Sequence, residues 1–487
     1  MRRALPGLVL FACVMAFAGE PKYQKPQVVI PPDWQAPSPW REAAPKDSLA
    51  KGTWWTLFGD SELNDYEQRA LGNNQTLKAA VARLAEARSF ARIATADYYP
   101  QLSANPSAER QRLSGNRPLV GGSSPATPVT QSIFQIPFDL NYEVDLFGRV
   151  RRSVEAANAS YQASAADLEN VRLTITAEVA ADFFQLRELD AEMAVVRKAL
   201  DYEQKGLQVV ENRHAGGAAS GLDVAQQQTI LNASLAQLSL LQQQRDQFQH
   251  ALAALQGLPA PSFVAPVRAL DAEPPAVPIL LPSELLERRP DVAEAERNTA
   301  AANARIGVAR AALFPSIGIG GSGGWQTRTL PALLNASSTF WSLGISALQP
   351  ILNGGRNRAA IENARAEYEE LAANYRESAL LAFQQVEDAL SSLNALSTAS
   401  SAQQQAVDAA NRALVLANAR YSGGLVTYLD VITAQEQLLA NERLATQLRG
   451  ERLVSSVLLV KALGGGWDSA SLAAVGVKPS IKQALQP

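Results

Sequence analysis

The sequence predicts a mainly α-helical protein with a β part that crosses a membrane, folded from two copies of one unit. Three observations support this prediction: an internal repeat, stretches of alternating apolar and polar residues, and very long helices with a heptad pattern. The chain has 487 residues, of which 47% are hydrophobic and 19% are charged. It is therefore too apolar for a disordered chain and long enough for more than one layer of structure.

The internal repeat is clearest at a glycine turn and its flanks. Arg213-His214-Ala215-Gly216-Gly217 corresponds to Arg420-Tyr421-Ser422-Gly423-Gly424 at an offset of 207 residues. Further upstream, Tyr99-Pro100 matches Phe314-Pro315 at an offset of 215, so one copy has a longer loop in between. We therefore expect two structurally equivalent units of roughly 200 residues.

Each unit contains a stretch with the two-residue period of a β-strand. In the first unit the apolar members are Phe134, Ile136, Phe138, Leu140, Tyr142 and Val144. The second unit repeats the alternation at Trp341, Leu343 and Ile345. Strands of about ten residues with one apolar and one polar face are typical of a transmembrane β-barrel wall. A half-buried strand of a soluble sandwich is the alternative that this pattern leaves open.

The polar face of the first strand carries three acidic residues, Asp139, Glu143 and Asp145. In a barrel wall they would face water in the lumen, and in a soluble protein they would form an ordinary solvated face. Their spacing implies no catalytic pair. Because four strands per chain cannot close a barrel in lipid without unpaired edges, several chains would have to share one.

Two helical stretches are far longer than ordinary helices. Small and apolar residues step by three and four along the second one, as in a heptad seam: Ile361, Ala364, Tyr368, Leu371, Tyr375, Ser378 and Ala382. At 1.5 Å per residue, a helix of about 65 residues extends roughly 100 Å. A glycine pair follows each long helix, Gly216-Gly217 and Gly423-Gly424, and permits a tight return. We expect two αα-hairpins with these pairs at their tips.

These patterns divide the chain as follows: signal peptide 1–18, Pro-rich N-terminal segment 19–60, first unit 61–257, Pro-rich crossover 258–290, second unit 283–464 and C-terminal tail 465–487. The first unit contains a helix, a β-hairpin at 101–146, a long helix at 150–214 and a return helix at 222–257. The second contains a helix, a β-hairpin at 316–350, a long helix at 356–420 and a return helix at 428–463. We expect the crossover to be an extended strap and not part of a core.

The N-terminus has the pattern of an export signal, in which Arg2 and Arg3 precede an apolar run that ends at Ala16-Phe17-Ala18. This run is shorter than the roughly 20 residues of a membrane-spanning helix. The single cysteine, Cys13, is either a lipidated anchor or is removed with the signal peptide. One cysteine cannot form an intramolecular disulfide.

Several functional classes are disfavoured by composition. The formal charge of -3 gives no basic field for nucleic acid. His214 and His250 are the only histidines and lack the spacing of a zinc site. The glycines at 318–324 are not followed by the Lys-Ser/Thr of a phosphate-binding loop. We expect no enzyme activity, no metal and no cofactor.

Three motifs resemble those of the TolC-like outer membrane factors, in the NodT-like branch that works with resistance-nodulation-division pumps. They are Trp54-Trp55-x-x-Phe58-x-Asp60-x-x-Leu63, Leu285-Leu286-Glu287-Arg288-Arg289-Pro290-Asp291-Val292 and Ala462-Leu463-Gly464-Gly465-Gly466-Trp467. The resemblance covers about residues 20 to 467. In one respect it departs from the branch, because Pro21-Lys22-Tyr23 begins eight residues after Cys13, farther than is usual after a lipidated cysteine.

The resemblance implies a homotrimer in the outer membrane, with a shared 12-stranded β-barrel and a periplasmic tunnel of twelve helices. Its function would be the passive export of drugs or other small solutes, received from an inner-membrane pump through a periplasmic adaptor. The resemblance also assigns Asp430 to the periplasmic aperture, and the internal repeat adds Asp223. An exposed helix N-cap is the alternative for both aspartates. The glycine pairs at the tips become candidates for adaptor or pump contact.

Two other functions share some of these features. A periplasmic coiled-coil adaptor or scaffold would also contain long hairpins, but the aromatic strands and the duplication favour a channel. Within the channel class, a duct for protein or metal-ion export is an alternative, because the pump largely sets selectivity.

Overall fold

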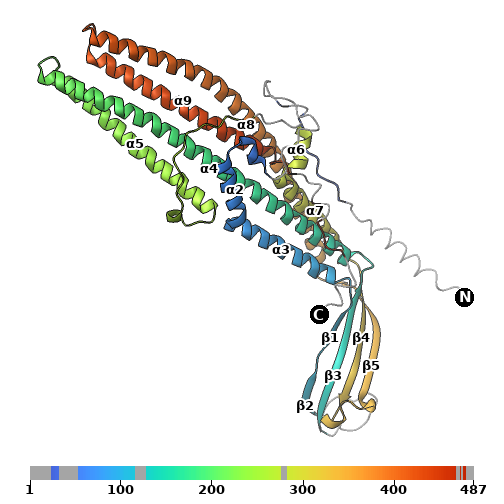
Figure 1. Cartoon of the computed structure of the whole chain (residues 1–487). Coiled ribbons are helices and arrows are strands. Elements are labelled where there is room, and N and C mark those ends of the chain that lie inside the picture. The colour runs from blue at the N-terminus through green and yellow to red at the C-terminus, as the bar shows by residue number, and fades with distance from the viewer. Residues whose placement is uncertain are drawn as a thin grey trace.

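The computed structural model describes residues 23–31, 34, 53–115, 128–275, 282–467, 472 and 475–478. Within these ranges the molecule is elongated, with paired helices along most of its length and a single sheet at one end (Figure 1). No helix in these ranges is both long and apolar enough to cross a membrane.

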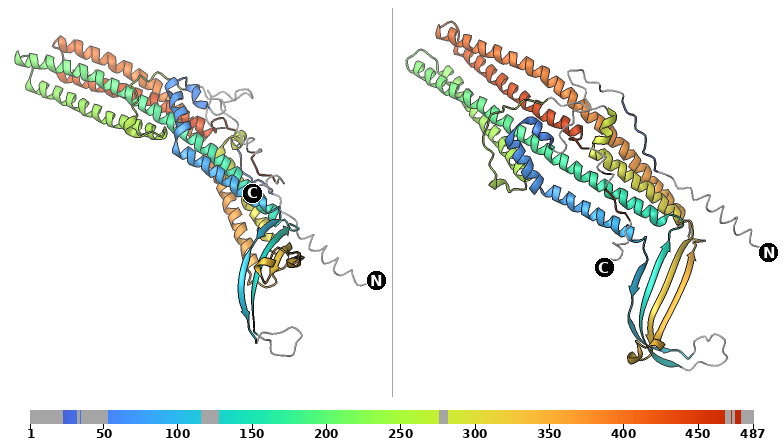
Figure 2. Two further views of the ribbon diagram at one scale, coloured as in Figure 1. Left: turned by 60° about the horizontal axis from the view of Figure 1, so that its bottom comes forward. Right: turned by 45° about the vertical axis from the view of Figure 1, so that its right-hand side comes forward.

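Two long hairpins form the helical part. The first consists of α4 (Arg149–Ala215) and α5 (Gly221–Leu255), and the second of α8 (Arg356–Ser422) and α9 (Tyr428–Ala462). Their tips lie beside each other at the end farthest from the sheet, which both views of Figure 2 also show. The shorter helices are α2 (Ser61–Asn73), α3 (Gln75–Ala96), α6 (Pro282–Arg288) and α7 (Pro290–Ala311), with 3-10 turns η1 (Trp54–Phe58), η2 (Ala260–Ser262), η3 (Leu330–Ala332) and η4 (Ala336–Ser338).

The sheet is antiparallel, with strands in the order β1-β3-β4-β5 and with β2 also paired to β3. Its strands are β1 (Gln101–Ala104), β2 (Ser107–Leu113), β3 (Val129–Val144), β4 (Ser316–Thr327) and β5 (Thr339–Leu348). Because β1 and β2 pair with successive parts of β3, they occupy one strand position. The sheet of the described residues therefore has four strand positions.

The pairing register turns the alternation in the sequence into two distinct faces. Phe138 lies opposite Gly323, which lies opposite Trp341, so these positions share the apolar face. Asp139 and Ser322 lie opposite each other on the polar face. Trp341 is 83% exposed, so no second sheet from the described residues covers the apolar face as in a soluble sandwich. An exposed apolar face of this kind marks contact with lipid or with another chain.

The sheet also has two open edges. Among the described strands, β5 pairs only with β4, and β1 and β2 pair only with β3. An open edge exposes backbone N–H and C=O groups that can form hydrogen bonds with a strand of another chain.

The main core lies in the middle of the molecule, where α2 and the N-terminal turn pack against α4. Phe58 and Phe184 have ring centroids 4.8 Å apart, and the indole of Trp54 donates to Thr176 Oγ1 at 3.2 Å. The crossover also contributes, because Phe263 and Leu270 are buried in this core. The expectation that the crossover lies outside a core is therefore wrong, because Phe263 and Leu270 are inserted between the helices, although Val264 remains exposed.

The duplication is visible as a repeated close contact. Gly257 and Gly464 both have a left-handed backbone, with φ of 70° and 86°. A Cβ on Gly257 would lie 2.6 Å from Asn73 O, and one on Gly464 would collide with Arg288 O. The glycines differ by 207 residues and the carbonyl partners by 215, the same two offsets that the sequence repeat has. Only glycine fits at these positions, because the backbone is left-handed and there is no room for a Cβ atom.

Residues next to these close contacts also form equivalent hydrogen bonds in the two units, and Arg289 of the Arg288-Arg289-Pro290-Asp291 motif is one of them. Asn74 and Arg289, also 215 residues apart, are the N-cap residues of α3 and α7. Asn74 Nδ2 donates to Leu255 O at 2.8 Å, and Arg289 Nη1 donates to Ala462 O at 3.2 Å. Arg289 also forms an ion pair with Asp291 at 2.6 Å. Each unit thus joins the start of a short helix to the end of its return helix.

Candidate aperture and hairpin tips

The two hairpin tips have the same backbone design. Gly217 and Gly424 have φ of 75° and 72°, a region that favours glycine. At the first tip Ala218 N donates to Arg213 O at 2.7 Å, and the second tip repeats this bond from Leu425 N at 2.9 Å. These bonds satisfy the last carbonyls of each long helix and reverse the chain within a few residues.

Both candidate aperture aspartates lie in the first turn of a return helix. Ser220 is the N-cap of α5 and Thr427 is the N-cap of α9, so Asp223 and Asp430 occupy the third helical position. Asp430 Oδ2 accepts from Thr427 N at 3.1 Å and from Thr427 Oγ1 at 2.7 Å, and Asp223 makes the same two contacts with Ser220. Neither aspartate is the N-cap residue itself, but both have the helix-capping role that this alternative describes. Each aspartate is the carboxylate of a capping box, which is the reason the local sequence folds in this way.

The capping boxes leave both carboxylates near solvent. Asp430 is exposed and Asp223 is half-buried. A capping box uses one carboxylate oxygen, so the second oxygen remains available to an ion outside.

Contacts between the hairpins hold the two tips together. The guanidinium of Arg213 lies 4.7 Å from the centre of the Tyr421 ring, and the rings of Tyr421 and Tyr428 are 5.1 Å apart. Tyr428 OH donates to Gln227 Oε1 at 2.8 Å. Burial, with smaller effects from Tyr421 and Asp223, raises the pKa of Tyr428 to about 12, so this phenol remains a neutral donor. The second tip is thereby fixed against both helices of the first hairpin.

The acidic residues of the strand do not form one group. Asp139 and Glu143 share the polar face of β3, but Glu143 is paired with Arg149 at 2.6 Å. Asp145 lies beyond the end of β3, where its carboxylate accepts from Val150 N at 3.1 Å and begins α4. The expectation that Asp145 belongs to the strand face is wrong, because this carboxylate caps a helix.

Cys13 and the expected signal peptide lie outside the described residues. The first described residue, Tyr23, donates from its hydroxyl to Glu296 Oε1 at 2.7 Å on α7.

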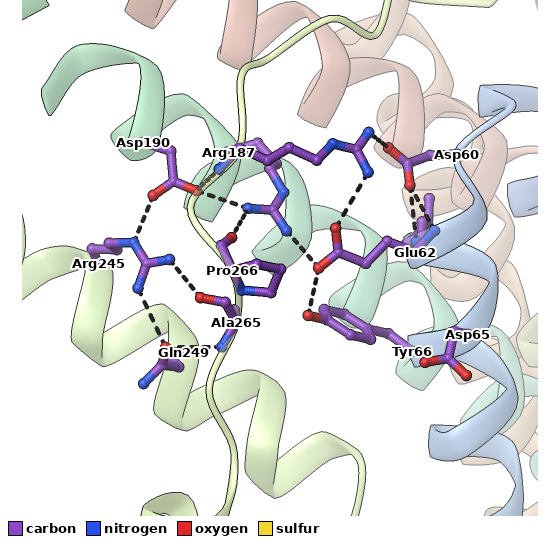
Figure 3. Close-up of polar contacts among 12 residues, drawn as sticks. Asp60, Glu62, Asp65, Tyr66, Arg187, Asp190, Arg245, Gln249, Ala265 and Pro266 are labelled. Carbon is purple, nitrogen blue, oxygen red and sulfur yellow. Dashed lines mark hydrogen bonds and ion pairs between the residues drawn. The ribbon is translucent and has the colours of Figure 1, made fainter. Parts of the chain in front are cut away.

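A buried ionic cluster was not anticipated from the sequence (Figure 3). Asp190 lies between two arginines: Oδ2 accepts from Arg187 Nη1 at 2.7 Å and Oδ1 accepts from Arg245 Nε at 2.6 Å. Arg187 also pairs with Glu62 of α2 at 2.6 Å. The side chains of Arg187 and Asp190 are only 2% and 1% exposed.

The ionic cluster connects the crossover to the first hairpin and to α2. Arg187 Nη1 donates to Pro266 O at 2.6 Å and Arg245 Nη2 donates to Ala265 O at 2.8 Å. Arg268 of the crossover pairs with Asp60 at 2.7 Å. A signal for this cluster was present in the sequence, because Arg187 and Asp190 lie at helical spacing between the apolar Phe183 and Met193. Charges so placed are usually paired.

No group of three or more metal-ligating side chains occurs in the described ranges. The geometry is that of a channel subunit, with a two-faced sheet at one end, paired helical hairpins along its length and carboxylates at the far tips. The family model for "Outer membrane efflux protein" matches residues 67–258 and 281–465. The chain belongs to this family of outer-membrane efflux channels.

Individual relatives agree with the family assignment. The chain is 39% identical over 438 residues to the pyoverdine export outer membrane protein OpmQ of Pseudomonas aeruginosa, covering 89% of this chain and 92% of the relative. It is 33% identical to the outer membrane protein OprJ of the same species, covering 95% of each. It is 31% identical to the cation efflux system protein CusC of Escherichia coli, covering 95% of this chain and 97% of the relative.

Solved structures agree as well. The outer-membrane channel OprN superposes with a TM-score of 0.84 at 28% identity, covering 92% of this chain and 99% of that one. CusC, described as forming a transmembrane channel, superposes with a TM-score of 0.80 at 29% identity, covering 92% and 99%. The alternative of a periplasmic adaptor or scaffold is not supported.

Proposed function

We propose that three copies of this chain form one passive exit duct through the outer membrane, continued by a helical tunnel in the periplasm. The observation that carries the proposal is the sheet with one apolar face, one polar face and two open edges. In lipid, backbone groups at an edge must be paired, and joining β5 of one copy to the β1 and β2 edge of the next would pair them. Three copies of four strand positions would give a barrel of 12 strands.

The helices support the same arrangement. In a ring of three copies, the two hairpins of each chain would alternate around a common axis, and α4 already packs against α9 of the other hairpin. Exposed small residues on α8, such as Ala360, Ala366 and Ala373, would allow a neighbouring copy to approach closely.

The aperture is proposed to lie at the tips. Three copies of Asp430, with Asp223 behind them, would place a negative ring where the tunnel narrows, and rings of carboxylates favour cations in other pores. The capping boxes support this role because they fix each carboxylate relative to its helix.

The partners are proposed to be a periplasmic adaptor and an inner-membrane pump, engaged at the tips around Gly216-Gly217 and Gly423-Gly424. These turns are exposed and lie at the end of the molecule farthest from the sheet. The energy that drives transport would come from the pump, since the chain itself acts as a passive conduit. The cargo is proposed to be a small solute. Pyoverdine, named for one relative, and cations, named for another, are two precedents.

The proposal predicts the mass of the purified protein. Native mass spectrometry in detergent should give a complex of three chains, because the sheet edges are unpaired in one chain or in any open arrangement. A complex of two chains would contradict the trimer. It would supply only eight strand positions, which could still form a closed barrel. A monomer would contradict the shared barrel itself.

A further inference from the structure

The apolar face of the sheet changes character at the end farthest from the helices (Figure 1). On this face, the apolar side chains of β3 occupy every second position from Val144 to Phe134. Beyond them, β2 pairs Arg110 with Ser132 and Arg112 with Thr130. Residues directly opposite each other in an antiparallel pair project to the same side. Both arginines therefore continue the apolar face at its far end.

Arg110 and Arg112 are the only charged residues on the apolar face of the described strands. The acidic residues of these strands, Glu109, Asp139 and Glu143, all lie on the polar face. Both arginines are exposed, and neither forms an ion pair within the described part of the chain. Their positive charges are therefore available to a group outside the protein.

The position of the two arginines along the sheet matches the border of a membrane. The ten residue steps from Phe134 to Val144 extend about 34 Å along β3. At a strand tilt of about 40°, this length corresponds to about 26 Å across the membrane, close to the height of the apolar band of a transmembrane barrel. Arg110 lies two positions beyond Phe134, or roughly 7 Å farther along the strand. It is therefore at the level of lipid headgroups.

An aromatic ring and the placement of charge support this border. Trp325 lies opposite Ile136, near the same end of the apolar band, where transmembrane barrels carry a girdle of aromatic residues. An arginine that faces lipid is costly at the middle of a membrane but costs little near its surface. The arginines thus occupy the level at which a charge on this face is tolerated and can meet a headgroup.

The chemistry of the arginines selects the headgroup. The helices extend from the other end of the sheet, so Arg110 and Arg112 face the exterior when the helices lie in the periplasm. The outer leaflet of an outer membrane consists largely of lipid A, a glucosamine disaccharide with phosphate groups on its sugars. Guanidinium groups bind phosphate oxygens through parallel N–H donors. The two arginines are about 7 Å apart along β2, so both can contact one phosphate.

We propose that Arg110 and Arg112 bind a phosphate group of lipid A in the outer leaflet, with the acyl chains of the lipid against Phe134 and Trp325. This inference rests on the proposed insertion of the sheet as a barrel wall. Three copies present three such sites around the barrel. Because β2 occupies an edge of the sheet, each bound lipid lies beside the joint between two copies.

The test is native mass spectrometry of the purified full-length protein in detergent, titrated with diphosphoryl lipid A. The wild-type trimer is expected to bind up to three molecules of lipid A. Arg110→Gln/Arg112→Gln is expected to weaken this binding at least about tenfold, because the charge-assisted hydrogen bonds to phosphate are lost. Lipid A from which both phosphates have been removed should bind weakly, and equally to the wild type and the variant.

Phosphatidylglycerol tests whether the site recognises lipid A or any anionic lipid. We expect it to bind the wild type less tightly than lipid A does, because its single phosphate diester carries less charge than the two phosphates of lipid A. Equal affinity for both lipids would overturn the assignment to lipid A. Unchanged affinity of Arg110→Gln/Arg112→Gln for lipid A would overturn the site itself.

Arg197→Gln/Arg412→Gln is the matched control, because it removes the same charge from exposed positions of α4 and α8 in the hairpins. It should leave the affinity for lipid A within about twofold of the wild type. Equal losses in both double variants would overturn the proposal, since they would indicate only general attraction to a basic protein. The same spectra give the mass of the complex. A trimer without preference for lipid A contradicts this inference alone, whereas absence of a trimer contradicts the proposed function and this inference with it.

Discussion

Replacing Asp190 with alanine is expected to destabilise the helical part by about 3–5 kcal/mol, because it leaves two buried guanidinium groups without their shared carboxylate. Asp190 accepts from both Arg187 and Arg245, and its side chain is 1% exposed. The crossover would be loosened as well, since the same arginines hold the carbonyls of Pro266 and Ala265. Loss of the helical circular dichroism signal on heating measures the effect as a large fall in the transition midpoint.

Asp65→Ala is the control for this result. Asp65 pairs with Arg69 on the surface of α2, where both side chains are 49% exposed, so its removal should cost no more than about 0.5 kcal/mol. If Asp190→Ala and Asp65→Ala unfold at the same temperature as the wild type, the ionic cluster does not hold the crossover in place.

Replacing Asp430 with asparagine is expected to reduce the preference of the channel for cations, because it removes one negative charge per copy from the proposed aperture. Asparagine is chosen because its side-chain oxygen can still accept from Thr427, so the start of α9 is kept. The reversal potential across a planar bilayer in a salt gradient measures the change, and it should move toward zero. Asp223→Asn should have a smaller effect, because Asp223 is half-buried.

Thr427→Ala separates the charge of Asp430 from its structural role. This variant removes the hydroxyl that donates to Asp430 Oδ2 but keeps the carboxylate. We expect it to retain cation preference, with destabilisation of about 1 kcal/mol from the lost cap. If Asp430→Asn keeps the wild-type reversal potential, the ring of carboxylates is not at the narrowest point of the path.

The repeated elements were accessible from sequence because each depends on a local pattern. The helices α4 and α8 span Arg149–Ala215 and Arg356–Ser422, within two residues of the expected ends, since a glycine lies just outside each terminus. The two faces of β3 follow from a period of two that continues unbroken through Phe138 and Tyr142. The family motif around Arg289 could be recognised, although its role in joining α7 to the end of α9 could not.

Other features depend on contacts between residues far apart in the chain. Asp190 and Arg245 are 55 residues apart, and Arg268 and Asp60 are 208 apart, so no local pattern places them together. Asp145 looked like the next member of an alternating strand, but its carboxylate is needed to begin α4.

The proposal that this chain forms a passive exit duct is tested most directly by conductance across a planar bilayer into which the purified wild-type protein has been inserted. We expect small, cation-selective currents, because the proposed aperture at the tips is lined by carboxylates. Absence of any current from protein that is inserted and folded would contradict a continuous path through the molecule. Anion-selective current would contradict the aperture assigned to Asp430.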